Sequence, residues 1–163
     1  YGKRKTMCEK LIKEGFRVRH GQLATREYVA VYNRSLATFH NARPGEIKWR
    51  WWEAGIMGCL NISGHSNLFP WLGYVPHVHY LPIETPIEDE WPTIESLVNC
   101  ISLLKNNQRM REDMTCSMRY KVLIQDTYYH RAKQIFESLS IERLVTETDS
   151  AIEQMLQKNG IKG

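Results

Sequence analysis

The sequence predicts an α/β fold with a parallel sheet, and three observations support this fold class. Short apolar stretches of strand length alternate with segments of helical periodicity in the N-terminal half. Loop and turn residues separate these stretches, and helices dominate the C-terminal half. The chain has 163 residues, of which 42% are hydrophobic, which is enough to bury one sizeable core.

Three elements are predicted before residue 36. Residues 6–14 carry apolar side chains at helical spacing, and Gly15 is a good stop signal for that helix. Residues 16–19 alternate apolar and polar side chains, as a short strand does. Residues 25–35 predict a second helix, with the side chain of Thr25 as its N-cap.

The middle of the chain predicts most of the sheet. Residues 41–45 (Asn-Ala-Arg-Pro-Gly) form a loop, and residues 47–57 after it predict a helix that Gly58 ends. Residues 63–91 are rich in glycine, proline and aromatic residues, so we expect one strand among them. That strand is expected near residues 77–81, and short stretches at residues 36–40 and 59–62 predict two further strands.

The C-terminal half is predicted to be helical. Thr93 follows a proline and is a good N-cap for a helix that ends near residue 104. Two further helices are expected, over residues 107–124 and 127–139. The last residues are polar and carry one weak helix, at about 149–158. We therefore expect one domain over residues 1–139 and a polar tail over residues 140–163.

The composition favours an anionic small-molecule ligand in a cytoplasmic protein. The net charge of +4 and the isoelectric point of about 8.9 suit a nucleotide diphosphate. They would also suit nucleic acid, but the positive charge is scattered and no cluster of cations with stacking aromatics is clear, so a nucleic-acid partner is not expected. No apolar run approaches the roughly 20 residues of a membrane-spanning helix.

No metal site is predicted. The four cysteines have no C-x-x-C spacing, so we expect them to be reduced and mostly buried, as in an intracellular protein. His77 and His79 would share one face of the predicted strand, as a metal-binding pair does, but no third ligand is evident. Among the neighbouring tryptophans, we expect Trp52 to pack in the core and Trp49 to lie at an interface.

Residues 35–63 (SLATFHNARPGEIKWRWWEAGIMGCLNIS) are the most informative segment. They place a strand, a loop, a helix and a second strand around the pattern Arg-x-x-Glu-Ala-x-x-x-Gly, which runs from Arg50 through Glu53 to Gly58. This order resembles the central block of retaining GT-B glycosyltransferases of the group 1 type, above all the spore-maturation CgeB-like branch. A Thr-Tyr-x-x-Arg run within residues 109–131 adds to the resemblance.

The resemblance covers roughly residues 1–139. It implies a Rossmann-like domain that forms the C-terminal, donor-binding half of a GT-B enzyme. Such an enzyme transfers a sugar from a nucleotide-sugar donor to an acceptor, without a further cofactor or metal. A second domain, expected before Tyr1 or on a partner chain, would supply the acceptor site and the catalytic base. The fragment alone would then be inactive.

The resemblance and the local chemistry together predict the donor site. The family glutamate that matches Glu53 accepts the ribose hydroxyls; otherwise this residue is an ordinary solvated helix position. A helix N-terminus suits a diphosphate, and Gly45 before it permits close backbone approach. His65 follows a strand and touches phosphate or sugar, or is a plain loop residue. The cations expected to add charge to the phosphate site are Arg43, Lys48 and Arg50.

The sequence departs from the family pattern in two ways. Many members carry a second glutamate eight residues before the first, and that position is Gly45 here. The usual opening strand and glycine-rich turn are not found after Tyr1. These departures favour an alternative, a degenerate glycosyltransferase-like domain that serves as a structural or interaction module. Its contact surface would be the aromatic loop that carries Phe69, Trp71, Tyr74 and Tyr80.

Overall fold

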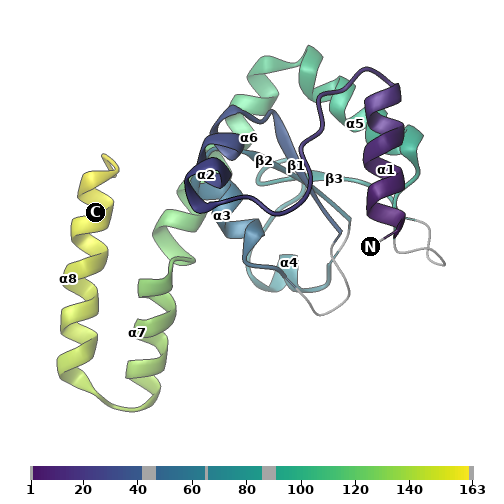
Figure 1. Cartoon of the computed structure of the whole chain (residues 1–163). Helices are drawn as coiled ribbons and strands as arrows, with labels where there is room; N and C mark the ends of the chain where they lie inside the picture. The colour runs from purple at the N-terminus through teal and green to yellow at the C-terminus, as the bar shows by residue number, and fades with distance from the viewer. Residues whose placement is uncertain (1, 42–46, 65, 86–90, 162–163) are drawn as a thin grey trace. The chain divides into compact units, whose positions relative to one another are not determined.

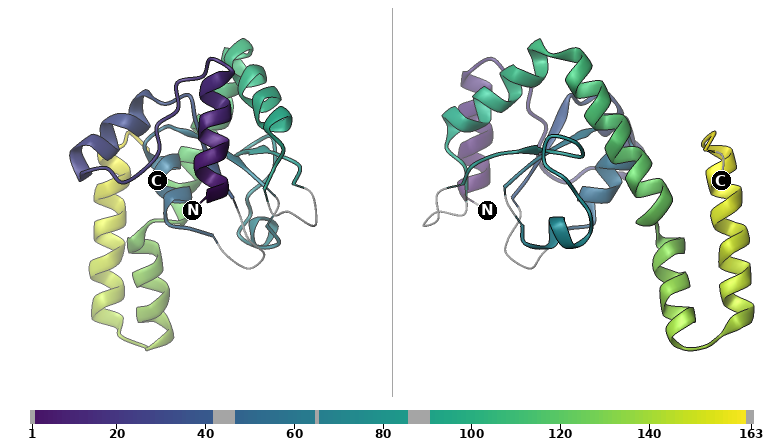
Figure 2. Two further views of the ribbon diagram at one scale, coloured as in Figure 1. Left: turned by 45° about the vertical axis from the view of Figure 1, so that its right-hand side comes forward. Right: turned by 180° about the vertical axis from the view of Figure 1, so that it is seen from behind.

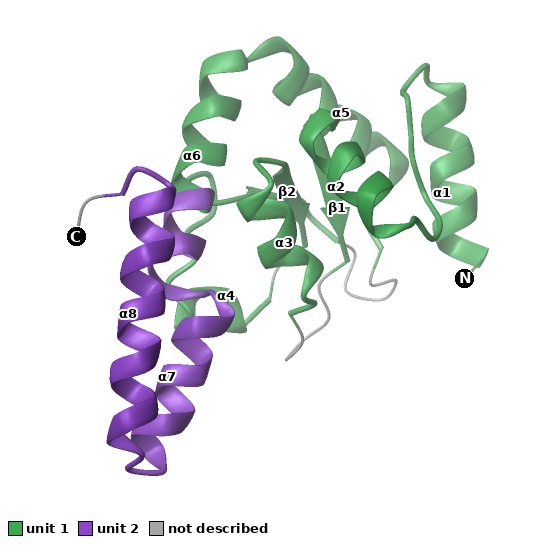
Figure 3. Cartoon of the chain, turned by 60° about the vertical axis from the view of Figure 1, so that its left-hand side comes forward, with its two compact units in different colours: residues 1–118 green, residues 119–163 purple. Residues whose placement is uncertain are grey.

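The computed structural model describes residues 2–41, 47–64, 66–85 and 91–161 (Figure 1). The chain divides into two compact units, Tyr1–Met118 and Arg119–Gly163, which Figure 3 colours separately. The division falls within helix α6 (Gln108–Gln125). Each unit is described below by itself.

The first unit contains a parallel three-stranded sheet in the order β1-β2-β3, which confirms the predicted α/β fold class. Its strands are β1 (Ala37–His40), β2 (Leu60–Ser63) and β3 (Leu81–Pro82). In the register of the sheet, Ser63 pairs with His40 on one side and with Pro82 on the other. Every residue of β2 is buried, as expected of a central parallel strand.

The helices of this unit follow the predicted order with small shifts of their ends. The side chain of Thr93 caps α5 by accepting a 3.1 Å hydrogen bond from the Ser96 N–H, as predicted. The N-cap of the second helix is Ala24 rather than Thr25, and its side chain makes no capping bond. The helices are α1 (Gly2–Lys13), α2 (Thr25–Arg34), α3 (Arg50–Ile56), the unpredicted α4 (Leu68–Trp71), α5 (Ile94–Asn106) and the start of α6.

One predicted strand was wrong and another begins later than expected, both for local reasons. Residues 16–19 are extended but pair with no strand of the described chain, and Phe16 and Val18 pack against the core from a connecting segment. Residues 77–80 form a tight turn before β3, in which the His77 N–H donates to the Tyr80 carbonyl at 2.8 Å. Alternating polarity at residues 16–19 therefore reflects partial burial without sheet pairing, and the strand expected at residues 77–81 begins only at Leu81.

The same turn rules out the two-histidine arrangement that the sequence suggested. His77 has a φ of 60° and does not share a strand face with His79. The Nδ1 atom of His79 accepts a 2.9 Å hydrogen bond from the Val75 N–H. Within the described ranges, no group of three or more histidine, cysteine, aspartate or glutamate side chains is arranged to hold a metal ion.

The two faces of β2 meet different surroundings. Successive strand side chains point to opposite faces, so Leu60 and Ile62 share one face while Asn61 and Ser63 share the other. The apolar pair belongs to a core formed with residues of α1 and α5, which run side by side in both views of Figure 2. On the other face, the Asn61 Nδ2 group donates a 3.0 Å hydrogen bond to the Trp51 carbonyl of α3.

A buried aromatic cluster connects α3 to α4 and to the turn before β3. The Trp51 ring stacks on Phe69 with a centroid separation of 4.3 Å and an interplanar angle of 19°. Its edge contacts with Tyr74 and Tyr80 have centroid separations of 5.7 and 5.2 Å. Three of the four aromatic residues expected to form a contact surface are therefore core residues, because Trp51 covers them; only Trp71 is exposed, at 80%.

The expected roles of the three neighbouring tryptophans change accordingly. Trp51 is the fully buried one, whereas Trp52, which we expected in the core, is only half-buried. Trp49 is 64% exposed and contacts the Trp52 ring edge-on. The buried face of α3 carries Trp51 together with Ala54 and Gly55, and Trp52 lies outside it.

The second unit contains a pair of antiparallel helices, α7 (Tyr128–Ser138) and α8 (Glu142–Lys158). The sequence predicted only a weak helix at residues 149–158, but α8 begins seven residues earlier. A short turn with Ser140 in the left-handed region joins the two helices. The Lys133 ammonium group forms a 2.6 Å ion pair with Asp149 across them. Contact with α7 therefore supports a longer helix than local sequence pattern indicates.

All four cysteines are free, as expected, and Cys8 and Cys59 are buried. Burial raises the pKa of the Cys59 thiol to about 12. Cys116 is exposed, so fewer cysteines are buried than we expected. Among the described helices, none combines the length and the hydrophobicity that crossing a membrane requires.

Replacing Trp51 with alanine should destabilise the first unit strongly. The change removes the ring that stacks on Phe69 and leaves a cavity, which costs about 3–5 kcal/mol for a buried tryptophan. Urea unfolding followed by circular dichroism measures this loss. The matched control is Trp71→Ala, which removes an exposed indole and should change the free energy of unfolding by less than about 0.5 kcal/mol. Equal losses in both variants would contradict a structural role for the aromatic cluster.

Candidate functional site

The candidate site lies at the carboxyl ends of the parallel strands. His40 and Ser63 end β1 and β2 and are register partners, so their side chains come from adjacent positions at this edge. Ligands of open α/β sheets bind at this edge. In Figure 1 the carboxyl ends point toward α4, away from the corner between α5 and α6. A small cavity of about 10 Å³ opens here, lined by His40, Asn41, Ile47, Lys48, Trp51, Ser63 and Phe69.

Two of the predicted cations lie at this edge. Lys48 is exposed and lines the cavity, and Arg50 is exposed at the first position of α3. Both cations lower the pKa of His40, which places their charges within electrostatic reach of the strand end. The three other predicted site residues, Arg43, Gly45 and His65, lie outside the residues that the structure describes.

Glu53, the predicted ribose-binding residue, is half-buried on α3 and is held by α2. The Tyr28 hydroxyl donates a 2.7 Å hydrogen bond to the Oε2 atom of Glu53. Burial raises the pKa of Tyr28, and the hydrogen bond to Glu53 raises it further, so the phenol stays protonated and remains a donor. The Tyr28 ring in turn packs on Tyr32, with centroids 4.6 Å apart. The orientation of the Glu53 carboxylate is therefore determined by α2.

Buried polar atoms without a partner gather around the same strand ends. Asn61 and Ser63 are both 0% exposed, although their strand is otherwise apolar. Native interiors leave few such atoms unsatisfied, and a group of them calls for an explanation such as a bound ligand. Within the described part of the chain, the side-chain atoms concerned are His40 Nε2, Asn41 Oδ1, Trp51 Nε1, Trp52 Nε1, Asn61 Oδ1 and Ser63 Oγ.

Sequence reasoning did not select any of these residues as part of a site. A signal was present, because Asn61 and Ser63 alternate with Leu60 and Ile62 in a strand that is fully buried. Polar residues at alternate positions of a buried strand predict that one of its faces meets polar surroundings. His40 ends the preceding strand and could have been identified by the same reasoning.

The imidazole of His40 is neutral at physiological pH. Burial, together with the charges of Arg50, Lys48 and Arg4, lowers its pKa to about 4. The side chain of Asn61 acts in the opposite direction and raises the pKa of His40. In the described structure, however, no hydrogen bond of normal geometry joins His40 Nε2 to Asn61 Oδ1. A neutral imidazole has one nitrogen that donates and one that accepts a hydrogen bond.

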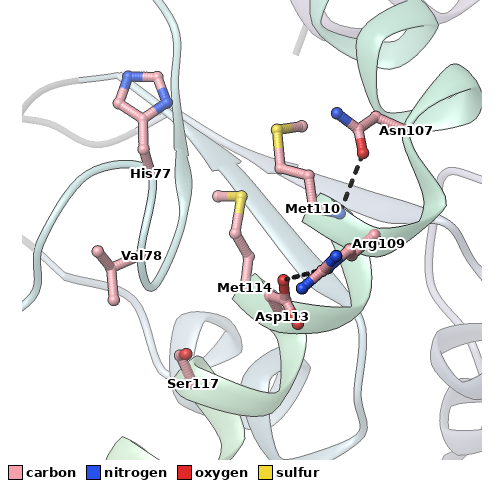
Figure 4. A pocket seen from close by; sticks show the side chains of 8 residues that line it. All are labelled: His77, Val78, Asn107, Arg109, Met110, Asp113, Met114 and Ser117. Atoms are coloured by element: carbon pink, nitrogen blue, oxygen red, sulfur yellow. Dashed lines mark hydrogen bonds and ion pairs between the residues drawn. The ribbon is translucent and has the colours of Figure 1, made fainter.

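A larger cavity of about 470 Å³ lies between the 77–78 turn and the start of α6 (Figure 4). It is separate from the carboxyl edge, because the turn precedes β3 and α6 follows the C-terminal end of α5. Its charged side chains, Arg109 and Asp113, are 95% and 74% exposed and form only a 3.9 Å ion pair. None of the residues predicted for the donor site lines it, so we do not assign the site there.

Because the partly buried imidazole of His40 is held in its neutral form, the stability of the protein should fall in mild acid. The unfolded chain protonates His40 near pH 6.5 and the folded chain near pH 4. The contribution of His40 to the free energy of unfolding is therefore fully present above pH 6.5. It is lost as the pH falls toward 4, and the loss amounts to roughly 3 kcal/mol. Urea unfolding at several pH values measures this loss. His40→Gln should reduce the loss, and the exposed control His20→Gln should leave it unchanged; equal curves for all three proteins would contradict this assignment.

Comparison with known proteins identifies the family of the chain. A family model described as glycosyl transferase-like matches residues 5–137, which include the whole sheet and helices α2 to α6. No curated protein and no solved structure matches the chain. The matched region covers most of the chain and its Rossmann-like parallel sheet. The chain therefore belongs to the glycosyl transferase-like family.

Proposed function

We propose that this chain is the donor-binding half of a GT-B glycosyltransferase, close to the CgeB-like branch, and that it binds a nucleotide sugar at the carboxyl edge of its sheet. The family match and the Rossmann-like parallel sheet support this function. The transferred sugar would pass to an acceptor held by a second domain or a partner chain. Loss of the nucleoside diphosphate would leave that sugar on the acceptor.

The observation that carries the proposal is the group of buried, unpartnered polar atoms beside two exposed cations. His40, Asn41, Trp51 and Ser63 contribute such atoms around the cavity at the strand ends. Lys48 lines the same cavity, so polar hydrogen-bonding groups and positive charge meet at one place. A nucleotide sugar carries hydroxyl groups and a diphosphate side by side and matches both kinds of group.

We assign the diphosphate to Lys48 and Arg50 and the ribose to Glu53. The hydrogen bond from Tyr28 uses Oε2 of Glu53, and a carboxylate can accept several further hydrogen bonds. Tyr28 therefore positions the carboxylate and leaves acceptor capacity for ribose hydroxyls. During transfer, negative charge develops on the departing diphosphate, and cations already in place stabilise it without reorganisation. The other contribution of this domain to catalysis is to hold the donor in one orientation.

The ribose assignment predicts that Glu53→Gln weakens the binding of nucleoside diphosphates by about 10-fold or more, the range for a hydrogen bond to a charged group. The amide keeps the size of the side chain and can still accept from Tyr28. Calorimetry of the intact protein with a panel of nucleoside diphosphates and nucleotide sugars measures the change. Glu14→Gln, which removes an exposed carboxylate after α1, is the matched control and should not alter affinity. No binding by the unmodified protein would overturn the proposed function.

The diphosphate assignment predicts that Lys48→Gln and Arg50→Gln each reduce the affinity for nucleoside diphosphates by about 2–5-fold, as expected for exposed cations. Each variant should also show a weaker dependence of affinity on salt concentration, because one charge contact is lost. Titrations at low and high salt measure both effects. Lys13→Gln removes an exposed cation at the end of α1 and should change neither quantity. Unchanged salt dependence in both site variants would remove these residues from the phosphate site.

A second candidate function is an interaction module derived from a glycosyltransferase. The observation that favours it is the exposure of Trp71, a large apolar side chain that is 80% exposed on α4. The replacement of the second family glutamate by Gly45 is also consistent with it. Nucleotide binding that depends on Glu53 favours the transferase. Absence of nucleotide binding, together with a protein partner lost in Trp71→Ala, favours the module.

A further inference from the structure

We propose that His40, Asn41, Trp51 and Ser63 form a subsite that binds one hydroxyl group of the transferred sugar. This inference rests on the proposed function, because it concerns the same donor site. It adds a part of the ligand that neither the family pattern nor the predicted residues assign. These four residues line the small cavity and carry its unpartnered polar atoms. We call this cavity the hydroxyl subsite.

The buried polar atoms of this subsite are held in place. Ser63 is 0% exposed at the end of the central strand, and Trp51 is 1% exposed within the aromatic cluster. The Nδ2 group of Asn61 donates to the Trp51 carbonyl, which fixes α3 against β2. In the described chain, none of the four side chains has a protein partner for the atom in question. The subsite is therefore preorganised for a group that is not part of the described protein.

The types of these atoms indicate a hydroxyl group rather than a phosphate. The Trp51 Nε1 group only donates hydrogen bonds, and the Asn41 Oδ1 atom only accepts them. The Ser63 hydroxyl and the neutral imidazole of His40 can do either. A phosphate only accepts, so the Asn41 oxygen would repel it. A sugar hydroxyl both donates and accepts, and it satisfies both kinds of atom at once.

The size of the cavity leads to the same choice. A cavity of about 10 Å³ has room for one water-sized group. A hydroxyl oxygen has this size, whereas a phosphate group or a sugar ring is larger. One hydroxyl group can therefore enter, while the ring to which it is attached remains outside.

The roles assigned to the neighbouring residues indicate which sugar supplies this hydroxyl. Glu53 and Arg50 are assigned to the ribose and the diphosphate, and neither lines the cavity. Lys48 lines the cavity and is also assigned to the diphosphate. The diphosphate joins the ribose to the transferred sugar, so a cavity that is lined by a diphosphate residue and not by the ribose residue adjoins the transferred sugar. The hydroxyl subsite therefore belongs to the transferred sugar.

Calorimetry with nucleotide sugars and with the matching nucleoside diphosphate tests this inference. Ser63→Ala removes one hydroxyl from the subsite and should weaken the binding of a nucleotide sugar about 5–20-fold. The same variant should bind the nucleoside diphosphate with unchanged affinity. Ser66→Ala is the matched control, because Ser66 is also buried but its Oγ atom already accepts a hydrogen bond from the Leu68 N–H. It should change neither affinity.

A second measurement uses the unmodified protein and does not depend on the folding of a variant. Donors that lack a single hydroxyl of the transferred sugar are compared with the complete donor. One deoxy donor should bind about 5–20-fold more weakly, and Ser63→Ala should abolish this difference, as in a double-mutant cycle. Equal affinity for all deoxy donors would show that the cavity holds only water and would overturn the inference. Equal losses for the nucleotide sugar and the diphosphate in Ser63→Ala would also overturn it, while leaving the donor-site function intact.

Discussion

The stacking of Trp51 on Phe69 is the contact on which the first unit depends. It joins α3, which follows β1, to α4, which follows β2, so two separate crossovers meet over one face of the sheet. Tyr74 and Tyr80 pack on the edge of the same indole. The residues on either side of Trp51 are thereby fixed as well. Lys48 and Arg50 lie at the strand ends, and Glu53 meets Tyr28 of α2.

This arrangement lets one strand serve both stability and binding. Leu60 and Ile62 of β2 face the apolar core, whereas Asn61 and Ser63 face α3. Burying polar side chains costs free energy unless hydrogen bonds compensate. Asn61 obtains one such bond from the Trp51 carbonyl, and Ser63 obtains none from the described chain. A bound ligand that supplies the missing partner would convert this local cost into binding free energy.

The order of helices and strands could be predicted from the sequence to a large extent, but the site could not. Strand lengths, glycine stops and the Thr93 cap are local signals, so the parallel sheet and most helices of the first unit were found. The extent of α8 was missed because its stability comes from packing on α7. The turn at residues 77–80 was missed because alternating polarity does not distinguish a turn from a strand.

By itself the sequence determined the fold class, the order of the elements and the family to which the chain belongs, because each rests on local residue patterns. It also identified Glu53, Lys48 and Arg50 as candidates for a donor site. Only the tertiary structure decided which tryptophan is buried and which polar atoms meet at the strand ends. The physical reason is that His40, Trp51 and Ser63 come together through strand register and aromatic packing, and neither interaction leaves a signal at a single position of the sequence.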